Sequence, residues 1–241
     1  MAEAFTERTA LLLGEEAVKR LATARVAIFG IGGVGGYVVE ALARAGIGTL
    51  DLFDPDTISE TNINRQLLAL HSTVGLYKTD VAAARARDIN PDIKVNCHKM
   101  FYWPPNADEV DLSVYDYIVD TVYPVTSKVE LAKRAKTLGV PIVSCMGTGS
   151  KLDATRLQIS DLTKTWGCPL ARSMRDLGRK SGIKHLRVVW SPEEAKGDTI
   201  FIGRGRYVPG SISYVPAAAA MLLAGEVINN LTKPAEEEAA P

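Results

Sequence analysis

Cysteine is scarce in this chain of 241 residues, where Cys97, Cys145 and Cys168 stand far apart and form no C-x-x-C pair. This spacing argues against a zinc site and against a disulfide framework. We expect Cys168, beside Pro169, to pack in the interior. The chain has no basic, apolar leader ending in small residues, so the sequence predicts no secretory signal and a cytoplasmic location.

Net charge and long apolar runs are lacking as well. The 28 Lys and Arg residues equal the 28 Asp and Glu residues in number, so any basic surface for an anionic partner must be local. The longest apolar run, residues 215–224, is too short for a membrane span. We expect it to form a buried helix that packs on a sheet or on a dimer partner.

The chain does contain an apolar run that leads directly into glycines, at residues 26–36. The G-x-G-x-x-G spacing is matched by Gly30, Gly32 and Gly35. This pattern predicts a tight turn between a first strand and a helix whose N-terminal N–H groups point at a phosphate. A second strand, residues 48–53, ends in Asp54, at the spacing where a ribose ligand is expected. The sequence therefore predicts a nucleotide site.

Strand-like and helix-like segments alternate through the first 145 residues, which predicts a parallel, doubly wound sheet. Residues 155–162 and 185–190 then alternate apolar and polar side chains, as antiparallel strands with one wet face do. We therefore expect an α/β fold in which a Rossmann-like, doubly wound, mostly parallel sheet is extended by antiparallel strands. The expected helices are residues 7–22, 78–89, 126–138 and 213–231, and a turn is expected at residues 207–211.

We expect one domain over residues 1–241, made of a nucleotide-binding half (1–145), a substrate-binding and dimerisation half (146–233) and a disordered tail (234–241). The second half contains a basic segment, residues 164–184. This segment suits a nucleic-acid phosphate backbone, with a solvated basic face as the alternative. Its cations are Lys164, Arg172, Arg175, Arg179, Lys180 and Lys184, and Arg204 and Arg206 lie nearby.

The polar loop after Asp54 favours a triphosphate over a dinucleotide. Two cations and several amides gather close to the glycines: Asn62, Asn64, Arg65, Gln66 and then Lys78. A dinucleotide's diphosphate needs little beyond backbone N–H groups, whereas a departing phosphate needs cations aimed at the developing charge. An NAD-binding oxidoreductase therefore remains only a minor alternative.

These motifs, in this order, resemble the ATP-dependent adenylating enzymes of the ThiF, MoeB and ubiquitin-activating type. They are Arg8 with Leu13-Gly14-Glu15, the glycine turn, Asp54-x-Asp56, Asn62-x-Asn64-Arg65-Gln66 and Gly75-x-x-Lys78. Within that superfamily the chain is most similar to the tRNA threonylcarbamoyladenosine dehydratases, in residues 41–48, 153–171 and 210–216. It has neither the C-x-x-C pairs nor the catalytic cysteine motif of activators that transfer sulfur or a protein tag.

The resemblance implies a reaction on N6-threonylcarbamoyladenosine at position 37 of tRNA. ATP adenylates the threonyl carboxylate and releases pyrophosphate, after which the ureido group closes on the activated carbonyl and expels AMP. Because the nucleophile is tethered, no enzyme cysteine is required. Two alternatives stay open: an adenylating activator of a small sulfur-carrier protein's C-terminus, and an ATP-binding scaffold with impaired catalysis. The resemblance also leaves room for sulfur-transfer partner proteins.

The resemblance also implies roles for individual residues. Gly30, Gly32, Gly33 and Gly35 form the phosphate turn, Asp54 holds the ribose with Asp56 beside it, and Asn62, Asn64, Arg65 and Gln66 line the triphosphate. Arg65 and Lys78 neutralise charge as pyrophosphate departs. Arg8 matches an arginine that reaches into the neighbouring subunit's site, which implies a homodimer. Surface salt bridges are the alternative reading of these three cations.

Two positions depart from the family pattern: Gly36, where the family usually has Ser and little effect is expected, and Tyr123, which bears on the metal. The family reads D-x-x-D after its fourth strand, and the second Asp is the expected magnesium contact, but here the tetrad is Asp120-Thr121-Val122-Tyr123. Since Mg²⁺ needs only one or two carboxylates beside phosphates and water, Asp120 is predicted to contact the nucleotide and the ion, or else ATP holds the ion. Tyr123 is also what motivates the scaffold alternative.

Overall fold

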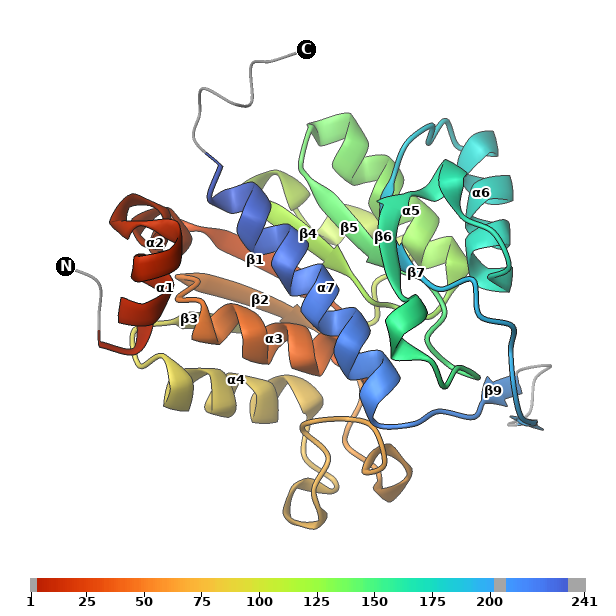
Figure 1. The fold of residues 1–241 in the computed structure, drawn as a ribbon, viewed down its shortest axis with the longest axis horizontal. Coiled ribbons are helices and arrows are strands. Elements are labelled where there is room, and N and C mark those ends of the chain that lie inside the picture. Colours follow the sequence, from red (N-terminus) through yellow and green to blue (C-terminus); the bar gives the residue numbers. More distant parts are fainter. Residues whose placement is uncertain (1–3, 202–206, 234–241) are drawn as a thin grey trace.

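The computed structural model describes residues 4–201 and 207–233. A seven-stranded sheet of order β3-β2-β1-β4-β5-β7-β6 runs through it (Figure 1). Neighbouring strands from β3 to β7 are parallel, and β6 pairs antiparallel with β7. The strands are β1 (Arg25–Phe29), β2 (Thr49–Phe53), β3 (Lys94–His98), β4 (Tyr117–Asp120), β5 (Ile142–Cys145), β6 (Gln158–Asp161) and β7 (Arg187–Trp190). The predicted Rossmann-like, mostly parallel sheet is thus confirmed, and its strand order reverses between β1 and β4.

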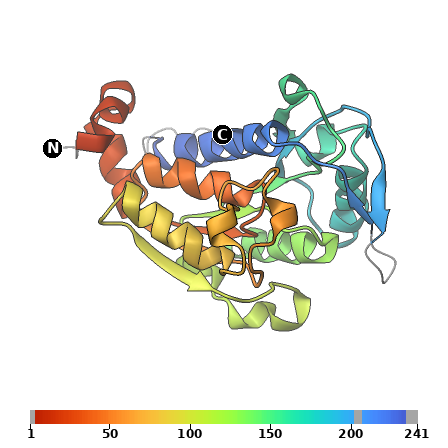
Figure 2. The ribbon, with the colours of Figure 1, turned by 90° about the horizontal axis from the view of Figure 1, so that it is seen from below.

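Helices cover both faces of the sheet, as parallel sheets require. One face carries α3 (Gly35–Arg44), α4 (Lys78–Ile89) and α7 (Tyr214–Leu231), and the other carries α5 (Val125–Leu138) and α6 (Pro169–Lys180) (Figures 1 and 2). The short 3₁₀ helices are η1 (Ala4–Thr6), η2 (Glu60–Asn62), η3 (His71–Thr73), η4 (Pro104–Glu109), η5 (Leu112–Val114), η6 (Ala154–Arg156) and η7 (Leu162–Lys164).

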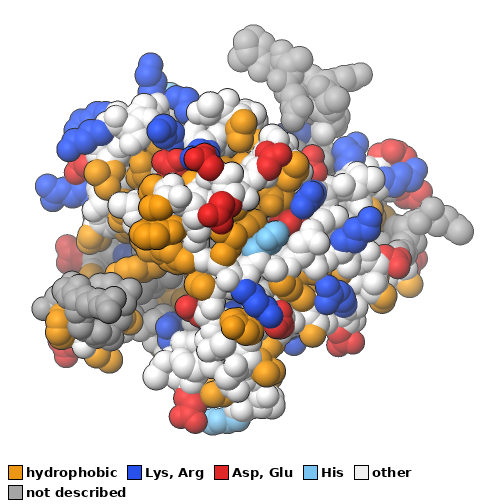
Figure 3. Space-filling model, turned by 180° about the vertical axis from the view of Figure 1, so that it is seen from behind, with side chains coloured by type: hydrophobic (Ala, Val, Ile, Leu, Met, Phe, Trp, Pro, Cys, Tyr) orange, Lys and Arg blue, Asp and Glu red, His pale blue; other side chains and the backbone are white. Residues whose placement is uncertain are grey.

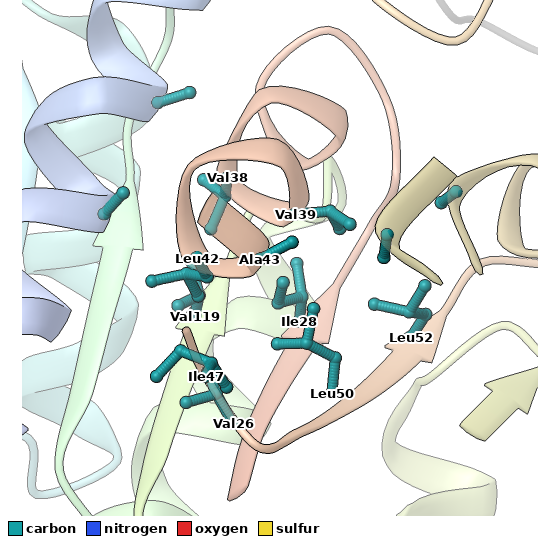
Figure 4. Close-up of a cluster of buried hydrophobic side chains, with 14 of the residues drawn as sticks. Val26, Ile28, Val38, Val39, Leu42, Ala43, Ile47, Leu50, Leu52 and Val119 are labelled. Carbon is teal, nitrogen blue, oxygen red and sulfur yellow. The ribbon is translucent and has the colours of Figure 1, made fainter. Parts of the chain in front are cut away.

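The largest core cluster holds α3 against the middle of the sheet (Figure 4). Val38 and Leu42 of α3 are fully buried, and they pack with apolar side chains of β1, β2 and β4 such as Ile28 and Leu50. Burying one such side chain stabilises the fold by about 1.5–3 kcal/mol. The helix that begins at the glycine turn is therefore fixed on the strands that deliver the turn.

Three local predictions differ from the structure. Residues 7–22 form two helices, α1 (Glu7–Leu13) and α2 (Glu15–Thr23), because Gly14 adopts φ +88° and ψ 156° between them. Residues 185–190 contribute β7, which pairs antiparallel with β6 as predicted, but β7 also pairs in parallel with β5 and is mostly buried, so the expected solvent-exposed face is wrong. Residues 207–211 begin with β9 (Tyr207–Pro209), which pairs with β8 (Thr199–Phe201).

The apolar run at 215–224 lies in α7, which buries Val215, Ala219 and Leu223 against the sheet, as predicted. Within residues 4–201 and 207–233, no helix has the length and apolar character that crossing a bilayer requires. Cys168 packs in the cluster between α5 and α6. The tail at 234–241 and Arg204 and Arg206 lie outside the described residues, and the division into two halves stays a prediction.

Candidate active site

The glycine turn joins β1 to α3 at the carboxyl end of the sheet. Gly30 has φ +89°, and a Cβ there would lie 2.9 Å from the backbone oxygen of Thr121. A Cβ on Gly35 would lie 1.8 Å from the oxygen of Gly30, so both positions require glycine. Gly32 and Gly33 have more room and leave their backbone bare. No side chain caps the start of α3, although the N–H groups of Gly36 and Tyr37 donate to the oxygens of Gly32 and Val34. The positive end of the helix dipole, together with the bare backbone of the turn, suits an anion.

Asp54 closes the turn from the end of β2. One carboxylate oxygen accepts the N–H of Ile31 at 2.7 Å, and the other accepts the N–H of Asp56 at 2.9 Å. Burial raises the pKa of Asp54, although Lys78 and these N–H groups oppose that shift. Lys78, the first residue of α4, places its Nζ 2.7 Å from Asp56 and 3.6 Å from Asp54. The predicted ribose and phosphate residues therefore meet beside the turn.

Arg65, in the polar loop, lies beside the same turn. Its Cγ lies 3.6 Å from where a Cβ of Gly33 would be. The guanidinium donates from Nη1 to the oxygen of Thr61 at 2.8 Å and to the side chain of Asn64 at 2.9 Å. Both acceptors are neutral, and no carboxylate within residues 4–201 and 207–233 pairs with it. Burial lowers the pKa of Arg65. Its charge is thus partly desolvated and uncompensated, which suits a phosphate.

The amides of the polar loop divide into two groups. Gln66 is buried, and its Nε2 lies 3.9 Å from the Cβ position of Gly32. Its Oε1 is one of the few buried polar atoms in the described part of the chain with no hydrogen-bond partner, as expected where a ligand supplies one. Asn62 instead accepts the N–H of Ser59, and Asn64 donates to the oxygen of Ser211 at 3.0 Å. Those two amides shape the loop in this structure.

Asp120 lies at the end of β4 but does not face the crevice as a free carboxylate. It is fully buried, and Lys128 of α5 donates to both of its oxygens at 3.1 Å. Ser144 and the N–H of Val122 also donate to it. Tyr123 is 69% exposed. The predicted nucleotide and metal contact of Asp120 stays a prediction, and this ion pair counts against it.

The donor set therefore does not fit a magnesium ion held by the protein. Asp54 and Asp56 face Lys78, Asp120 faces Lys128, and a neutral phenol stands where the family has its second Asp. Among residues 4–201 and 207–233, no three His, Cys, Asp or Glu side chains gather as a metal site. Magnesium needs fewer protein ligands when phosphates supply the rest.

Arg8 lies apart from this site. It is exposed on α1, next to η1, where Thr6 contacts Gly46 just beyond the C-terminus of α3. This is the amino-terminal end of the strands, away from the polar loop (Figure 1). One chain therefore does not bring Arg8 to its own glycine turn.

Sequence patterns missed the residues that brace the turn from β4 and α5. Thr121 donates to the oxygens of Phe29 at 2.9 Å and Gly30 at 2.6 Å. Lys128 also donates to the oxygen of Cys145 at 2.8 Å, and only 1% of its surface is exposed. A lysine eight residues beyond an acid gives no local signal of such an ion pair, because it depends on how α5 packs.

Comparisons with known proteins agree with this geometry. The ThiF family model matches residues 6–241. The chain is 37% identical over 241 residues to a tRNA threonylcarbamoyladenosine dehydratase of Bacillus subtilis, covering 95% of each chain. Two crystal structures of the Escherichia coli enzyme TcdA, a tRNA N6-threonylcarbamoyladenosine dehydratase, are also similar at 31% identity. The complex with AMP superposes with a TM-score of 0.87 and 99% and 98% coverage, and the complex with ATP with 0.85 and 99% coverage of both chains.

Proposed function

The chain belongs to the ThiF family, and we propose that it acts there as an ATP-dependent tRNA threonylcarbamoyladenosine dehydratase. The relatives described above support this assignment. The observation that carries it is the half-buried Arg65, whose Cγ lies beside the glycine turn and whose guanidinium bonds only neutral oxygens. Such a charge suits a reaction in which a phosphate group leaves.

In the first step, a carboxylate oxygen of the threonylcarbamoyl group attacks the α-phosphorus of ATP. The new bond gives an acyl-adenylate, and the bond to pyrophosphate breaks. The glycine turn and the start of α3 hold the phosphates through backbone N–H groups. Arg65 and Lys78 stabilise the negative charge that grows on pyrophosphate. We expect magnesium to arrive on the ATP phosphates, since the nearby carboxylates already face lysines.

In the second step, the ureido group of the same side chain attacks the activated carbonyl, and AMP leaves. The nucleophile and the carbonyl belong to one molecule, so positioning replaces a covalent enzyme intermediate. This agrees with the cysteines: Cys145 is buried with its pKa raised to about 12 by burial, and Cys168 is buried as well. Neither is suited to act as a nucleophile.

Nucleoside mass spectrometry tests the proposal directly. Incubation of the chain with ATP and tRNA that carries the threonylcarbamoyl group should convert that nucleoside to a cyclic product lighter by one water. ATP should yield AMP and pyrophosphate only when this tRNA is present. Release of ADP and phosphate would contradict adenylation. Pyrophosphate exchange that responds to a carrier protein and not to tRNA would favour the activator alternative, and ATP binding without AMP release would favour the scaffold.

We also propose a homodimer in which Arg8 completes the partner's site. Leu11 and Leu12 of α1 are 85% and 83% exposed, and adjacent exposed leucines are typical of a protein contact. Mixing an Arg8→Ala chain with an Arg65→Ala chain should restore part of the activity, because one of the two sites in the mixed dimer contains both arginines. The check is AMP formation after subunit exchange has been verified by mass. Exchange without any recovery would contradict the trans arrangement.

The RNA is expected to bind on the side of α6. Arg172, Arg179 and Lys180 of this helix are exposed, as is Lys164 before it. On the face opposite α7, both basic and acidic side chains border a hydrophobic patch (Figure 3), so the RNA is expected at the exposed cations of α6. Exposed cations along a helix suit the phosphate backbone of tRNA. We also propose a cytoplasmic location, which a tRNA substrate supports.

A further inference from the structure

Trp166 is an exposed aromatic side chain that the adenylation chemistry does not use. It is 58% exposed, and its ring meets Trp190 edge to face, with 6.1 Å between ring centroids. Trp190 is buried and donates from its indole nitrogen to Ser160 at 2.9 Å. One tryptophan is thus held in the core, and the other stands on it with most of its surface in solvent.

The backbone around Trp166 is anchored on both sides. Thr165 is buried, and Arg175 of α6 donates to its backbone oxygen at 2.9 Å. On the other side, Gly167 has φ +71°, and a Cβ there would lie 2.9 Å from the oxygen of Pro192. Cys168 is also buried. The indole of Trp166 loses little conformational entropy on binding, because its backbone is held between the buried Thr165 and Cys168 and its ring already packs on Trp190.

Trp166 lies at the same edge of the sheet as the glycine turn. Pro192 follows the end of β7, and Cys168 lies 3.7 Å from the Cβ position of Gly147, which follows the end of β5. In the sheet, β4 and β5 separate β1 from β7. With strands about 4.8 Å apart, the end of β7, against which Trp166 packs, lies about 15 Å from the end of β1. Trp166 is therefore on the side of the crevice away from β2 and Asp54.

The charges around the indole are suited to a nucleic acid. Lys164, two residues before Trp166, is exposed, and so is Arg172 in the first turn of α6. An aromatic ring with nearby cations is how proteins hold unpaired bases, the ring stacking on the base and the cations facing the backbone. Duplex RNA keeps its bases stacked on one another and offers no free base to such a ring.

We propose that Trp166 is a stacking platform for an unpaired base next to the reacting adenosine in the RNA substrate. This inference rests on the proposed function, because it needs RNA to enter the crevice from the β7 side. The platform selects a single-stranded loop over a duplex and helps bring the threonylcarbamoyl group to the glycine turn. Trp166 contributes to the affinity for RNA, and the affinity for ATP does not depend on it.

The test compares the binding of two RNAs to the full chain: an anticodon stem-loop with an unpaired loop, and a duplex of the same length. Trp166→Ala should weaken binding of the stem-loop about 5- to 150-fold, since stacking one base contributes about 1–3 kcal/mol. Trp166→Tyr should retain most of the affinity because it keeps an aromatic ring. Leu177→Ala is the matched control, since Leu177 is an exposed, non-aromatic side chain on α6.

Binding of the duplex and of ATP should be the same in Trp166→Ala and in the unaltered chain, and so should the thermal unfolding midpoint. An equal loss for both RNAs, or no loss for the stem-loop, would overturn the platform while leaving the dehydratase reaction standing. If the unaltered chain binds no stem-loop and forms no cyclic nucleoside, the proposed function fails and the platform fails with it.

Discussion

Replacing Arg65 by alanine is expected to lower the rate of AMP formation about 100- to 1,000-fold, the usual cost of removing one group that stabilises transition-state charge. The Cγ of Arg65 lies beside the glycine turn, and the guanidinium has no carboxylate partner in the described part of the chain. Its charge is therefore available to pyrophosphate, on which negative charge grows as it leaves. Binding of ATP should weaken much less than turnover, because interactions made mainly in the transition state appear in kcat.

Two further variants show whether the effect depends on the positive charge of Arg65, on the shape of its guanidinium, or on losing any arginine. Arg65→Lys should recover only part of the rate, because lysine keeps the charge but not the planar, forked donor set. Arg85→Ala is the control, since Arg85 makes a surface ion pair with Glu40 away from the turn, and such pairs contribute about 0–1 kcal/mol. Steady-state AMP formation and ATP binding by calorimetry supply the two readouts. A normal kcat with weakened ATP binding in Arg65→Ala would assign the residue to ground-state binding.

The parts of the fold that follow from local sequence could be predicted. Gly35 is required by its contact with Gly30, five residues earlier, and Gly30 is required by its own φ of +89° as well as by the distant Thr121, so the spacing of the two glycines in the sequence carries the signal. The expected helix at 78–89 matches α4 at both ends, because Lys78 follows a polar loop and Asn90 ends an alanine-rich, charged run. Alternation of strands and helices likewise predicted the parallel sheet.

The rest depends on contacts between distant segments, which a single sequence does not display. The parallel pairing of β7 with β5 joins segments more than 40 residues apart, whereas the break at Gly14 reflects the positive φ that glycine adopts without strain. Asp120 was predicted to face the nucleotide because acids at strand ends often do. Its partner Lys128 is on a helix whose rotation on the sheet decides whether the lysine points inward or out.

The second large effect is expected at the buried ion pair between Asp120 and Lys128. Lys128→Met should destabilise the chain by about 3–5 kcal/mol, because it leaves the fully buried Asp120 carboxylate without its cation. It should also loosen the glycine turn, since the next residue, Thr121, donates to the oxygens of Phe29 and Gly30. Chemical unfolding measures the first effect. Weaker ATP binding by the protein that stays folded measures the loosening of the glycine turn. Lys128→Arg should retain much of the ATP binding that Lys128→Met loses.

The double variant Asp120→Asn with Lys128→Met separates a structural pair from a metal ligand. It removes both charges together, so it should recover a large part of the stability that Lys128→Met alone loses. If Asp120 only accepts hydrogen bonds from Lys128, Ser144 and Val122 and does not bind the ion, the magnesium concentration for half-maximal AMP formation should stay within about twofold of that of the unaltered chain. A carboxylate that held the ion would leave a different result: the double variant would fold well yet need far more magnesium, because an amide binds this hard cation much more weakly than a carboxylate does. We expect the first result, because each oxygen of Asp120 already accepts two hydrogen bonds.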